Sequence, residues 1–282
     1  MGLTEERSTM IEDVVQAREF DFSAADFERV RKLIYGKAGI NLNPSKQQMV
    51  YSRLSRRLRD LGQRSFASYL DDLERRDDAG EWQQFINALT TNLTSFFREA
   101  HHFPVLAEYL RTLSGPVRGW CSAASTGEEP YSIAITANEA IGKARLSLLA
   151  TDIDTSVLER CRRGVYADEQ TKGLSDERLK RNFLRGKGSN EGMVRVRPEL
   201  GQQIEFAQFN LLNATWSLGK PFDFVFCRNV LIYFDRPTQD TVLRKIHSVL
   251  KPGGLLFIGH SENFSEMREL YRLKGKTVYE RI

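Results

Sequence analysis

The chain has 282 residues, of which 41% are hydrophobic and 28% charged, a balance typical of a globular protein with one large core or two smaller ones. No apolar run approaches the roughly 20 residues of a membrane span, and the first ten residues lack the apolar segment of a signal peptide, so we expect a cytoplasmic protein. Three widely separated cysteines argue against disulfides and zinc sites, and a net charge of +4 is too small to indicate nucleic-acid binding by itself.

The first 90 residues predict a polar tail followed by a small helical domain. Residues 1–21 are polar and show no clear period, so we expect a mobile tail there. Within residues 22–90, Ser23 and Asp26 have the spacing of a capping box, and apolar residues recur at helical spacing in four segments. The expected helices start at Ser23 and after Pro44, the second one ending at Gly62, and the others span Phe66–Arg75 and Gly80–Thr90.

The second of these helices has a basic face. Between Pro44 and Leu61 five basic residues stand against one acid, an excess equal to the net charge of the whole chain. Such a face is either a solvated helix surface or a docking surface for an acidic partner, and the pattern leaves both interpretations open. The basic residues are Lys46, Arg53, Arg56, Arg57 and Arg59.

Residues 91–115 connect the helical domain to the rest of the chain. The run TNLTSFFRE lacks Gly and Pro and combines two aromatic residues with Asn92, Thr94 and Arg98. At a domain junction this mixture suits the wall of a cleft, although helix capping and packing of the aromatic rings would also explain it. A helix is expected over His101–Leu113, and because neighbours in sequence point apart on a helix, we expect no metal ion at the adjacent histidines.

Residues 116–282 predict an α/β domain whose centre is the run VRGWCSAASTGEE, residues 117–129. This run has the pattern of a strand, a tight turn of small residues and the start of a helix. Small side chains and Gly127 would let the backbone approach a nucleoside, whereas Glu128 and Glu129 would repel a pyrophosphate. A cationic or neutral nucleoside therefore fits, but a plain strand-to-helix turn explains the run equally well.

Later strands also end in polar side chains. Asp152 follows the strand Leu146–Ala150, where a nucleoside-binding sheet holds ribose hydroxyls, and Asp154 is the expected N-cap of a helix over residues 155–163. Arg228 and Asn229 follow the strand of residues 222–226 and should face the same crevice. The remaining elements are a helix capped by Asp235 and stopped by residues 250–254, a strand over residues 255–259 and a last antiparallel strand over residues 271–282.

An inserted β-subdomain is expected at about residues 185–209. Val194 and Val196, then Ile204 and Phe206, alternate around residues 198–201 as an antiparallel hairpin would. The glycine-rich run RGKGSNEG, residues 185–192, is either an ordinary loop or one side of a groove that accepts a peptide strand.

Five runs together resemble one known family. TNLTSFFRE, AASTGEEPYS, ATDID, FCRNVLIYF and LKPGGLLFIGHSE, in this order and spacing, are similar to the chemotaxis receptor methyltransferases (CheR family), and the match covers nearly the whole chain from about Phe22. The resemblance implies a class I methyltransferase fold with a Rossmann-like sheet. It also implies methyl transfer from S-adenosylmethionine to glutamates of methyl-accepting chemoreceptors, giving glutamate methyl esters and S-adenosylhomocysteine, in chemotaxis adaptation.

The resemblance further assigns site residues. Tyr233 would lie near the transferred methyl group and Arg98 would position a carboxylate, so these two are the expected catalytic residues. A glutamate side chain, with a pKa of about 4.3, is ionised at neutral pH and needs no general base, so catalysis would come from alignment and removal of water. The expected cofactor contacts are Asn92, Thr94, Arg98, Glu129, Asp152, Asn210, Leu211, Arg228 and Asn229.

Two partner surfaces follow from the resemblance. Receptor methylation helices are acidic, so Arg53, Arg56, Arg57 and Arg59 are the expected docking residues. Some members also tether to a receptor's C-terminal pentapeptide by strand addition, and others do not. The expected tether residues are Gly186, Gly188, Gly192, Arg195 and Arg197. We expect a monomer without membrane insertion or bound nucleic acid.

Two competing functions are weighed against this one. A nucleic-acid methyltransferase would carry a D/N-P-P-Y/F loop after the fourth strand, whereas this strand ends in Arg228-Asn229-Val230-Leu231. A cofactor-sensing signalling module would bind the cofactor without transferring the methyl group, and intact Arg98 and Tyr233 argue against it. Transfer of a radiolabelled methyl group to receptor-containing membranes would distinguish a receptor methyltransferase from such a cofactor-sensing module.

Overall fold

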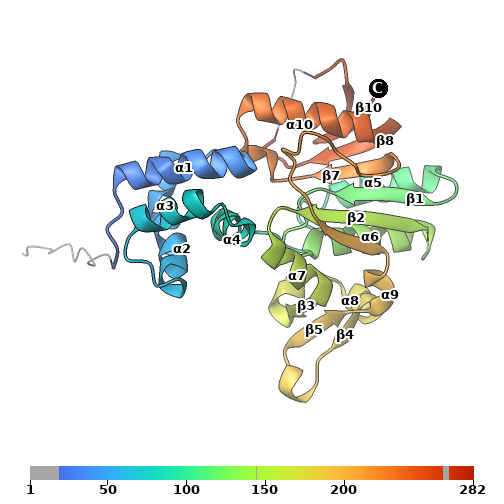
Figure 1. Cartoon of the computed structure of the whole chain (residues 1–282). Coiled ribbons are helices and arrows are strands. Elements are labelled where there is room, and N and C mark those ends of the chain that lie inside the picture. The colour runs from blue at the N-terminus through green and yellow to red at the C-terminus, as the bar shows by residue number, and fades with distance from the viewer. Residues whose placement is uncertain (1–18, 144, 263–266) are drawn as a thin grey trace, which may run out of the picture.

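A computed structural model describes residues 19–143, 145–262 and 267–282, which form a helical lobe beside a larger α/β lobe (Figure 1). Most of the expected mobile tail, residues 1–18, lies outside the described residues. The last part of that tail is anchored, because the ring of Phe20 packs edge-on against Phe66 with centroids 6.3 Å apart. Among the described residues, no helix is both long and apolar enough to cross a membrane.

The helical lobe contains the four predicted helices, which share one core. The capping box is confirmed, because Ser23 accepts a hydrogen bond from the backbone N–H of Asp26 while Asp26 accepts one from that of Ser23. Val30, Leu54 and Phe85, from three of the helices, are completely buried in this core. The helices are α1 (Ala24–Ala38), α2 (Gln47–Asp60), α3 (Phe66–Arg76) and α4 (Ala79–Leu89), with the 3-10 turn η1 (Pro44–Lys46) before α2.

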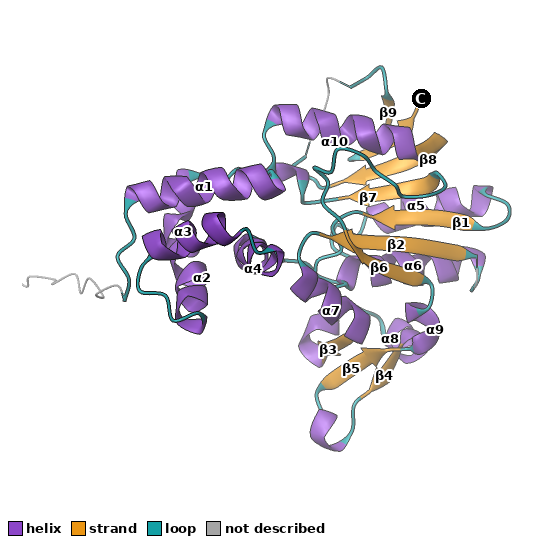
Figure 2. Cartoon of the chain, viewed as in Figure 1, coloured by secondary structure: helices purple, strands orange, loops and turns teal. Residues whose placement is uncertain are grey.

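The α/β lobe is built on a seven-stranded sheet with the order β6-β2-β1-β7-β8-β10-β9 (Figure 2). The first five strands of that order are parallel, and β10 and β9 add an antiparallel edge. The last segment is thus a hairpin rather than a single strand. The strands are β1 (Val117–Cys121), β2 (Leu146–Asp152), β6 (Ile204–Gln208), β7 (Phe222–Cys227), β8 (Leu250–Ile258), β9 (Tyr271–Gly275) and β10 (Val278–Arg281).

Helices cover both faces of this sheet, which explains why its central strands are apolar throughout. Phe224 and Phe226 of β7 pack in the core that contains residues of α5 and α6, whereas Val225 and Cys227 pack in the core that contains residues of α10. Successive side chains of a strand point to opposite faces, so all of β7 is buried. These helices are α5 (His102–Thr112), α6 (Glu128–Ile141), α7 (Thr155–Arg163) and α10 (Arg236–Val249).

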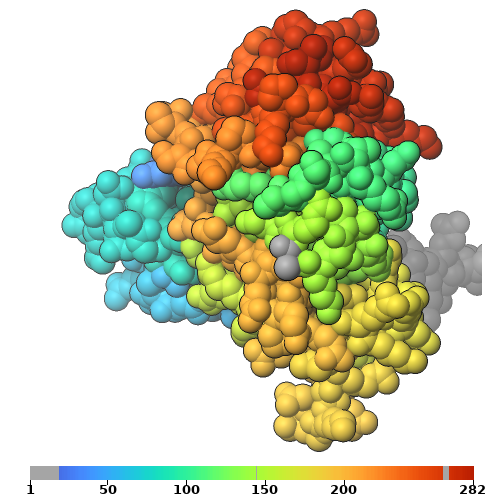
Figure 3. Space-filling model, turned by 90° about the vertical axis from the view of Figure 1, so that its right-hand side faces the viewer, coloured from blue at the N-terminus to red at the C-terminus, as the bar shows by residue number. Residues whose placement is uncertain are grey.

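A separate three-stranded antiparallel sheet, with the order β3-β5-β4, forms the predicted β-subdomain. Its tip protrudes from the body of the molecule (Figure 3). The subdomain begins earlier in the chain than predicted. Its elements are β3 (Val165–Ala167), η2 (Asp168–Thr171), α8 (Asp176–Asn182), β4 (Phe183–Arg185), η3 (Gly188–Asn190) and β5 (Met193–Val196), and α9 (Pro198–Gly201) follows.

The hairpin predicted between residues 194–196 and 204–206 is wrong. β5 pairs with β3 and β4, whereas β6 leaves the subdomain and pairs with β2 in parallel. A helical turn that begins at Pro198 separates the two strands. The alternation around Phe206 is real, but it reflects packing on the main sheet, where the Phe206 ring lies 5.9 Å from that of Tyr131.

A second boundary also differs from the prediction. The helix α10 ends at Val249 as expected, but β8 begins directly at Leu250 instead of at Leu255. Leu250 pairs with Phe222, and the register of the two strands then shifts, so the chain continues as strand beyond the irregularity. Gly253, with a φ of 73°, supplies the backbone conformation that the irregularity requires.

Candidate functional site

A cavity of about 320 Å³ lies where the helical lobe meets the carboxyl ends of the parallel strands. The structure brings all nine expected cofactor-contacting residues to its wall, together with Tyr233. The helical lobe contributes Ile40, Lys46 and Met49, which the sequence did not indicate as cavity residues. Parallel strands end at one edge of a sheet, which is why residues so far apart in sequence meet here. Their contact with a cofactor stays a prediction.

The turn between β1 and α6 has the tight geometry that its small residues predicted. Ser125 and Gly127 both have positive φ values, 48° and 103°. A Cβ atom on Gly127 would lie 2.5 Å from the hydroxyl oxygen of Tyr166, so a larger residue would displace the turn. The Sγ of Cys161 donates a hydrogen bond to the carbonyl oxygen of Ser125 at 3.1 Å, and this contact helps to hold the turn in place.

Asp152 lies at the end of β2 with only 8% of its surface exposed. Its carboxylate accepts hydrogen bonds from the backbone N–H groups of Ser125, at 2.8 Å, and Asp154, at 3.0 Å. Burial raises the pKa of Asp152 to about 6, against the opposing effect of these hydrogen bonds. Asp152 therefore has a carboxylate on the cavity wall that changes charge close to neutral pH.

Asp154 is confirmed as the N-cap of α7 and has a further role that the sequence did not reveal. One carboxylate oxygen accepts from the backbone N–H of Ser156 at 2.9 Å. The other accepts from the hydroxyl of Thr90 at 2.6 Å and from the side-chain amide of Asn92 at 2.8 Å. This carboxylate thereby joins the α/β lobe to the connector and holds Asn92 at the cavity.

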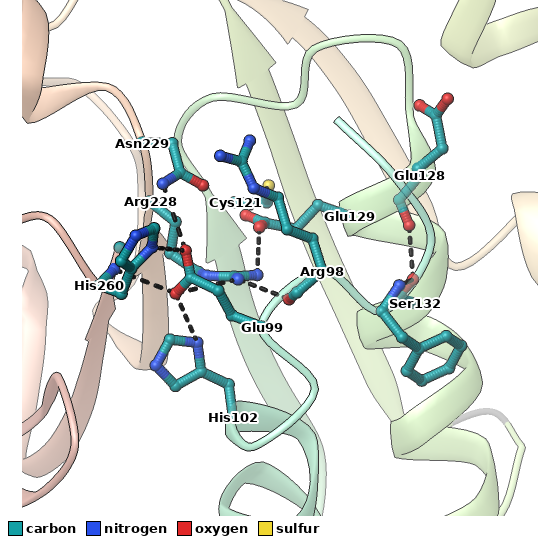
Figure 4. Close-up of polar contacts among 12 residues, drawn as sticks. Arg98, Glu99, His102, Cys121, Glu128, Glu129, Ser132, Arg228, Asn229 and His260 are labelled. Carbon is teal, nitrogen blue, oxygen red and sulfur yellow. Dashed lines mark hydrogen bonds and ion pairs between the residues drawn. The ribbon is translucent and has the colours of Figure 1, made fainter. Parts of the chain in front are cut away.

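Arg228 is the buried centre of the site, with no exposed side-chain surface (Figure 4). Its guanidinium donates to Glu129 at 2.6 Å and to the carbonyl oxygen of Arg98 at 2.5 Å, and it lies 3.4 Å from Glu99. Burial raises the pKa of Glu129, and the charge of Arg228 partly offsets that rise. The Sγ of Cys121 donates to the same carboxylate at 3.4 Å. Arg228 thus compensates two carboxylates and holds the chain next to Arg98.

Glu99 is a member of the site that sequence reasoning missed. Its carboxylate accepts from the backbone N–H of His260 at 3.1 Å and from the side-chain amide of Asn229 at 3.3 Å, and it lies 3.1 Å from Nδ1 of His260 (Figure 4). Burial opposes ionisation, but the contacts with His260 and the charge of Arg228 prevail and lower the pKa of Glu99 to about 2. The only signal in the sequence is its place at the end of the run TNLTSFFRE.

The turn that carries Arg98 has unusual backbone conformations. Phe97 and Glu99, on either side of Arg98, have φ values of 54° and 53°, a region that costs non-glycine residues about 1–3 kcal/mol each. The backbone N–H of Phe97 donates to the hydroxyl of Ser132 at 2.9 Å, which helps to hold the turn. The guanidinium of Arg98 donates to the carbonyl oxygen of Leu93 at 2.8 Å. Arg98 therefore projects from a fixed turn, with its side chain pointing away from Glu99 (Figure 4).

Tyr233 and Asn210 lie where the two lobes touch. The carbonyl oxygen of Tyr233 accepts from the backbone N–H of Asn41 at 2.8 Å, and the side-chain amide of Asn210 donates to the carbonyl oxygen of Lys37 at 2.9 Å. Tyr233 is half-buried at the end of the 3-10 turn η4 (Leu231–Tyr233) and lines the cavity. The helical lobe thus closes one side of the site.

The predicted docking arginines of α2 differ in their surroundings. Arg53 donates to the carbonyl oxygen of Thr90 at 2.5 Å, Arg57 donates to Glu81 at 2.9 Å, and Arg59 lies 3.4 Å from Glu19. Arg56 is exposed and has no ion-pair partner among the residues that the structure describes. The same holds for Lys46, which lines the cavity. Within the described part of the chain, Arg53, Arg56 and Lys46 therefore have no acidic partner, and of these three Arg53 donates to backbone carbonyl oxygens.

The predicted tether residues lie in the connection between β4 and β5, on the central strand β5 and directly after it. Gly186 is required by packing, because a Cβ atom there would overlap the carbonyl oxygen of Asn190, and Gly188 and Gly192 have φ values of 59° and 78°. Arg195 is exposed on the central strand β5, and Arg197 follows that strand. Beside the edge strand β4 is a hollow of about 780 Å³ whose basic lining residues are Lys172, Lys180, Arg185 and Arg197.

The adjacent histidines do not point apart as expected. The rings of His101 and His102 are tilted toward each other with centroids 4.2 Å apart, and both residues have side-chain atoms close to those of Glu99. Burial lowers the pKa of His102 to about 3, with a further contribution from Arg228. Because Arg228 lies 3.4 Å from the same Glu99 carboxylate, its positive charge opposes binding of a cation at this cluster.

Known proteins resemble this chain over both of its lobes. A family profile described as "CheR methyltransferase, all-alpha domain" matches residues 25–90, and one described as "CheR methyltransferase, SAM binding domain" matches residues 92–279. A chemotaxis protein methyltransferase of Escherichia coli is 54% identical over 259 residues, covering 91% of each chain. Chemotaxis protein methyltransferase 2 of Pseudomonas aeruginosa is 52% identical over 267 residues, covering 93% of this chain and 95% of that one.

Proposed function

This chain belongs to the CheR methyltransferase family, and from that membership we propose that it methylates specific glutamate side chains of methyl-accepting chemoreceptors. The family establishes a chemotaxis methyltransferase with a domain that binds S-adenosylmethionine. The proposed products are glutamate methyl esters and S-adenosylhomocysteine. The observation that carries the proposal is that the nine expected cofactor residues and Tyr233 all line one cavity.

The chemistry of the cavity wall fits S-adenosylmethionine. The molecule carries a positive sulfonium, an amino group, a carboxylate and ribose hydroxyls, and when bound it supplies an electrophilic methyl group. Asp152 would accept hydrogen bonds from the ribose hydroxyls, and the carboxylate of Glu129 favours a positive charge nearby. Ser122, Ala123 and Ser125 of the turn line the cavity, and their small side chains let the backbone lie close to a nucleoside. Arg98 supplies a positive charge for a carboxylate.

The chain's own residues would then align the acceptor and exclude water. The acceptor glutamate is ionised at neutral pH, so its carboxylate oxygen forms the bond to the methyl carbon while the methyl–sulfur bond breaks and its electron pair stays on sulfur. Arg98, on its fixed turn, would orient the acceptor carboxylate, and the hydroxyl of Tyr233 would orient the reacting groups. No proton has to be moved, so the contribution of these residues is alignment and electrostatics.

Two surfaces support a receptor as the partner. Lys46 at the cavity and Arg56 on the exposed face of α2 present positive charge without an acidic partner among the described residues, which suits an acidic methylation helix. The edge strand β4, with the basic hollow beside it, suits addition of a peptide strand such as an acidic, aromatic receptor pentapeptide. Titration of the protein with such pentapeptides, compared with a sequence-scrambled control, tests the second surface separately.

The test of the proposed function is methyl transfer itself. Purified protein, radiolabelled S-adenosylmethionine and receptor-containing membranes should give label on the receptor that is released by mild base, as glutamate methyl esters are. Receptors whose methylated glutamates are replaced by alanine should stay unlabelled. Tight binding of S-adenosylhomocysteine without any transfer would contradict the proposal and favour the cofactor-sensing alternative.

A further inference from the structure

Two large apolar side chains are exposed where the cofactor cavity opens. Leu93, in the connector, is 80% exposed, and Ile232, next to Tyr233, is 49% exposed. Both residues line the cavity. Leu93 has the highest exposure of the large exposed hydrophobic residues in the described part of the chain. Exposed apolar side chains at the mouth of a site indicate a contact surface, because leaving them in water is unfavourable.

Basic groups accompany these apolar ones. Lys46 is exposed and lines the same cavity, and the guanidinium of Arg98 is held next to Leu93 by its hydrogen bond to the carbonyl oxygen of that residue. A partner that is acidic at one position and aliphatic beside it therefore complements this opening. Any methyl acceptor must pass the opening to reach the cavity, so the acceptor is the molecule that meets these side chains.

We propose that Leu93 and Ile232 form an apolar lip that packs against the acceptor segment beside its methylated carboxylate. The inference rests on the proposed function, because it takes the acceptor to be a glutamate of another protein. The lip then selects segments in which an aliphatic or small apolar side chain lies next to that glutamate. A basic side chain at that position would lose its water on docking and would meet the positive charges of Lys46 and Arg98, so it would be disfavoured.

Substitutions that keep the backbone and change only the lip test this inference. Leu93→Gln and Ile232→Thr should each lower kcat/KM for the receptor by about tenfold, as expected when a substantial apolar contact is lost. Affinity for S-adenosylhomocysteine, measured by calorimetry, should stay within about twofold. Leu93→Met keeps the apolar surface and should behave like the unaltered chain. Leu273→Gln, a change of another exposed leucine on the edge strand β9, is the matched control.

Several outcomes would overturn the lip. Leu93→Gln would do so if it methylated receptors as well as Leu273→Gln does, or if its defect lay in cofactor affinity. A dimer in equilibrium sedimentation that is lost in Leu93→Gln would assign the lip to self-association instead. Co-sedimentation with receptor membranes tests the contact without relying on transfer. Failure of the unaltered chain to transfer a methyl group would count against the proposed function alone.

A second, independent observation concerns a buried carboxylate behind the cavity. Glu262 is 5% exposed and does not line the cavity. Its Oε2 accepts from the backbone N–H groups of Gly259, at 2.6 Å, and Asn229, at 3.0 Å, and its Oε1 accepts from that of Ile232 at 3.3 Å. Asn229 and Ile232 belong to the segment between β7 and α10 that carries Arg228 and Tyr233.

The surroundings of Glu262 permit only a narrow geometry. A Cβ atom on Gly259 would lie 2.5 Å from the side-chain amide of Asn229 and 2.9 Å from the Glu262 carboxylate, so only glycine allows this approach. Asn229 has a φ of 58°, a conformation that needs support from its neighbours. Burial raises the pKa of Glu262, whereas the hydrogen bonds from backbone N–H groups favour its ionised form, and these hydrogen bonds supply that support.

The geometry points to Glu262 as a positioning residue for Asn229 and Tyr233. A glutamine at this position would keep one accepting oxygen and would turn an NH₂ group toward a backbone N–H donor. The segment would therefore shift, and the groups on the cavity wall would shift with it. This second inference uses the family's methyl transfer and does not depend on which protein accepts the methyl group.

Comparison of Glu262→Gln with Glu269→Gln tests the assignment, because Glu269 is exposed and only loosely paired with Arg244 at 3.5 Å. Glu262→Gln should lower kcat by about tenfold or more and weaken S-adenosylhomocysteine binding, while the receptor KM stays close to that of the control. Thermal unfolding of the two variants checks that the fold persists. If Glu262→Gln does not fold, Glu262→Asp, which keeps the charge, replaces it. Unchanged kcat in a folded variant, or a defect in receptor KM alone, would overturn the assignment.

Discussion

The cavity proposed to hold the cofactor and the basic face of α2 both contain charged side chains, but these are arranged in opposite ways. Around Arg228 the charges are buried and paired, with Glu129 at 2.6 Å and Glu99 at 3.4 Å. On α2, Arg56 is exposed and has no ion-pair partner among the described residues. Buried pairs fix geometry and are costly to break, whereas exposed charges attract a partner weakly and at a distance. Substitutions in the cavity should therefore have large effects on stability and turnover. Substitutions on α2 should have small, salt-dependent effects on the receptor KM.

The largest effect is expected from removing Arg228. Arg228→Met leaves the carboxylates of Glu99 and Glu129 buried without their cation, which typically costs about 3–5 kcal/mol of folding stability. Urea denaturation should show this loss, and calorimetry should show no binding of S-adenosylhomocysteine. Arg244→Met, which removes an exposed arginine, is the control and should be nearly neutral. Equal stability of the two variants would contradict the contrast between the two regions.

The next largest effect is expected at Tyr233. Tyr233→Phe removes the hydroxyl and keeps the ring, so turnover should fall on the order of tenfold to a hundredfold, as for other groups that contact the transition state. Affinity for S-adenosylhomocysteine should change much less. Initial-rate measurements at saturating receptor and cofactor check the turnover, and an unchanged kcat would remove Tyr233 from the mechanism.

A pH dependence is expected from Asp152. Because burial raises its pKa to about 6, the side chain is ionised above that pH and gains a proton below it. Only the ionised form accepts hydrogen bonds from both ribose hydroxyls, so affinity for S-adenosylhomocysteine should fall by about tenfold per pH unit once the pH is well below 6. Calorimetry at pH values from about 5 to about 8, which lie on both sides of this pKa, measures the fall. Asp152→Asn should bind weakly at every pH, and a pH-independent affinity in the unaltered chain would exclude this role.

The smallest effect is expected on α2. Reversing Arg53 and Arg56 to Glu should raise the receptor KM and leave cofactor binding intact, and the difference should shrink as salt rises. Arg56→Glu alone is the cleaner change, because Arg53 also donates to the carbonyl oxygen of Thr90. Lys46→Glu should behave similarly. Equal methylation by Arg56→Glu and the unaltered chain at low salt would refute the docking role of this face.

The sequence predicts the residues that line the cavity better than it predicts the hydrogen bonds that hold those residues in position. Residues such as Asp152 and Arg228 follow buried strands, and the ends of parallel strands necessarily converge. The partners of Glu99 and Arg53, in contrast, are distant in sequence or are backbone groups, which no local pattern reveals. The wrong hairpin at residues 194–206 has a similar cause, because period-two alternation indicates a strand but not its neighbour.

The hydrogen bond from Cys161 to the turn at Ser125 places a thiol next to the backbone that is proposed to contact the nucleoside. Cys121, Cys161 and Cys227 are all buried, and burial raises the pKa of each thiol, so the reactive thiolate form is scarce. Alkylating reagents would thus modify the native chain only during transient opening of this region. The rate of alkylation at Cys161 would report how often the turn comes apart, and ligands that occupy the cavity would slow that rate.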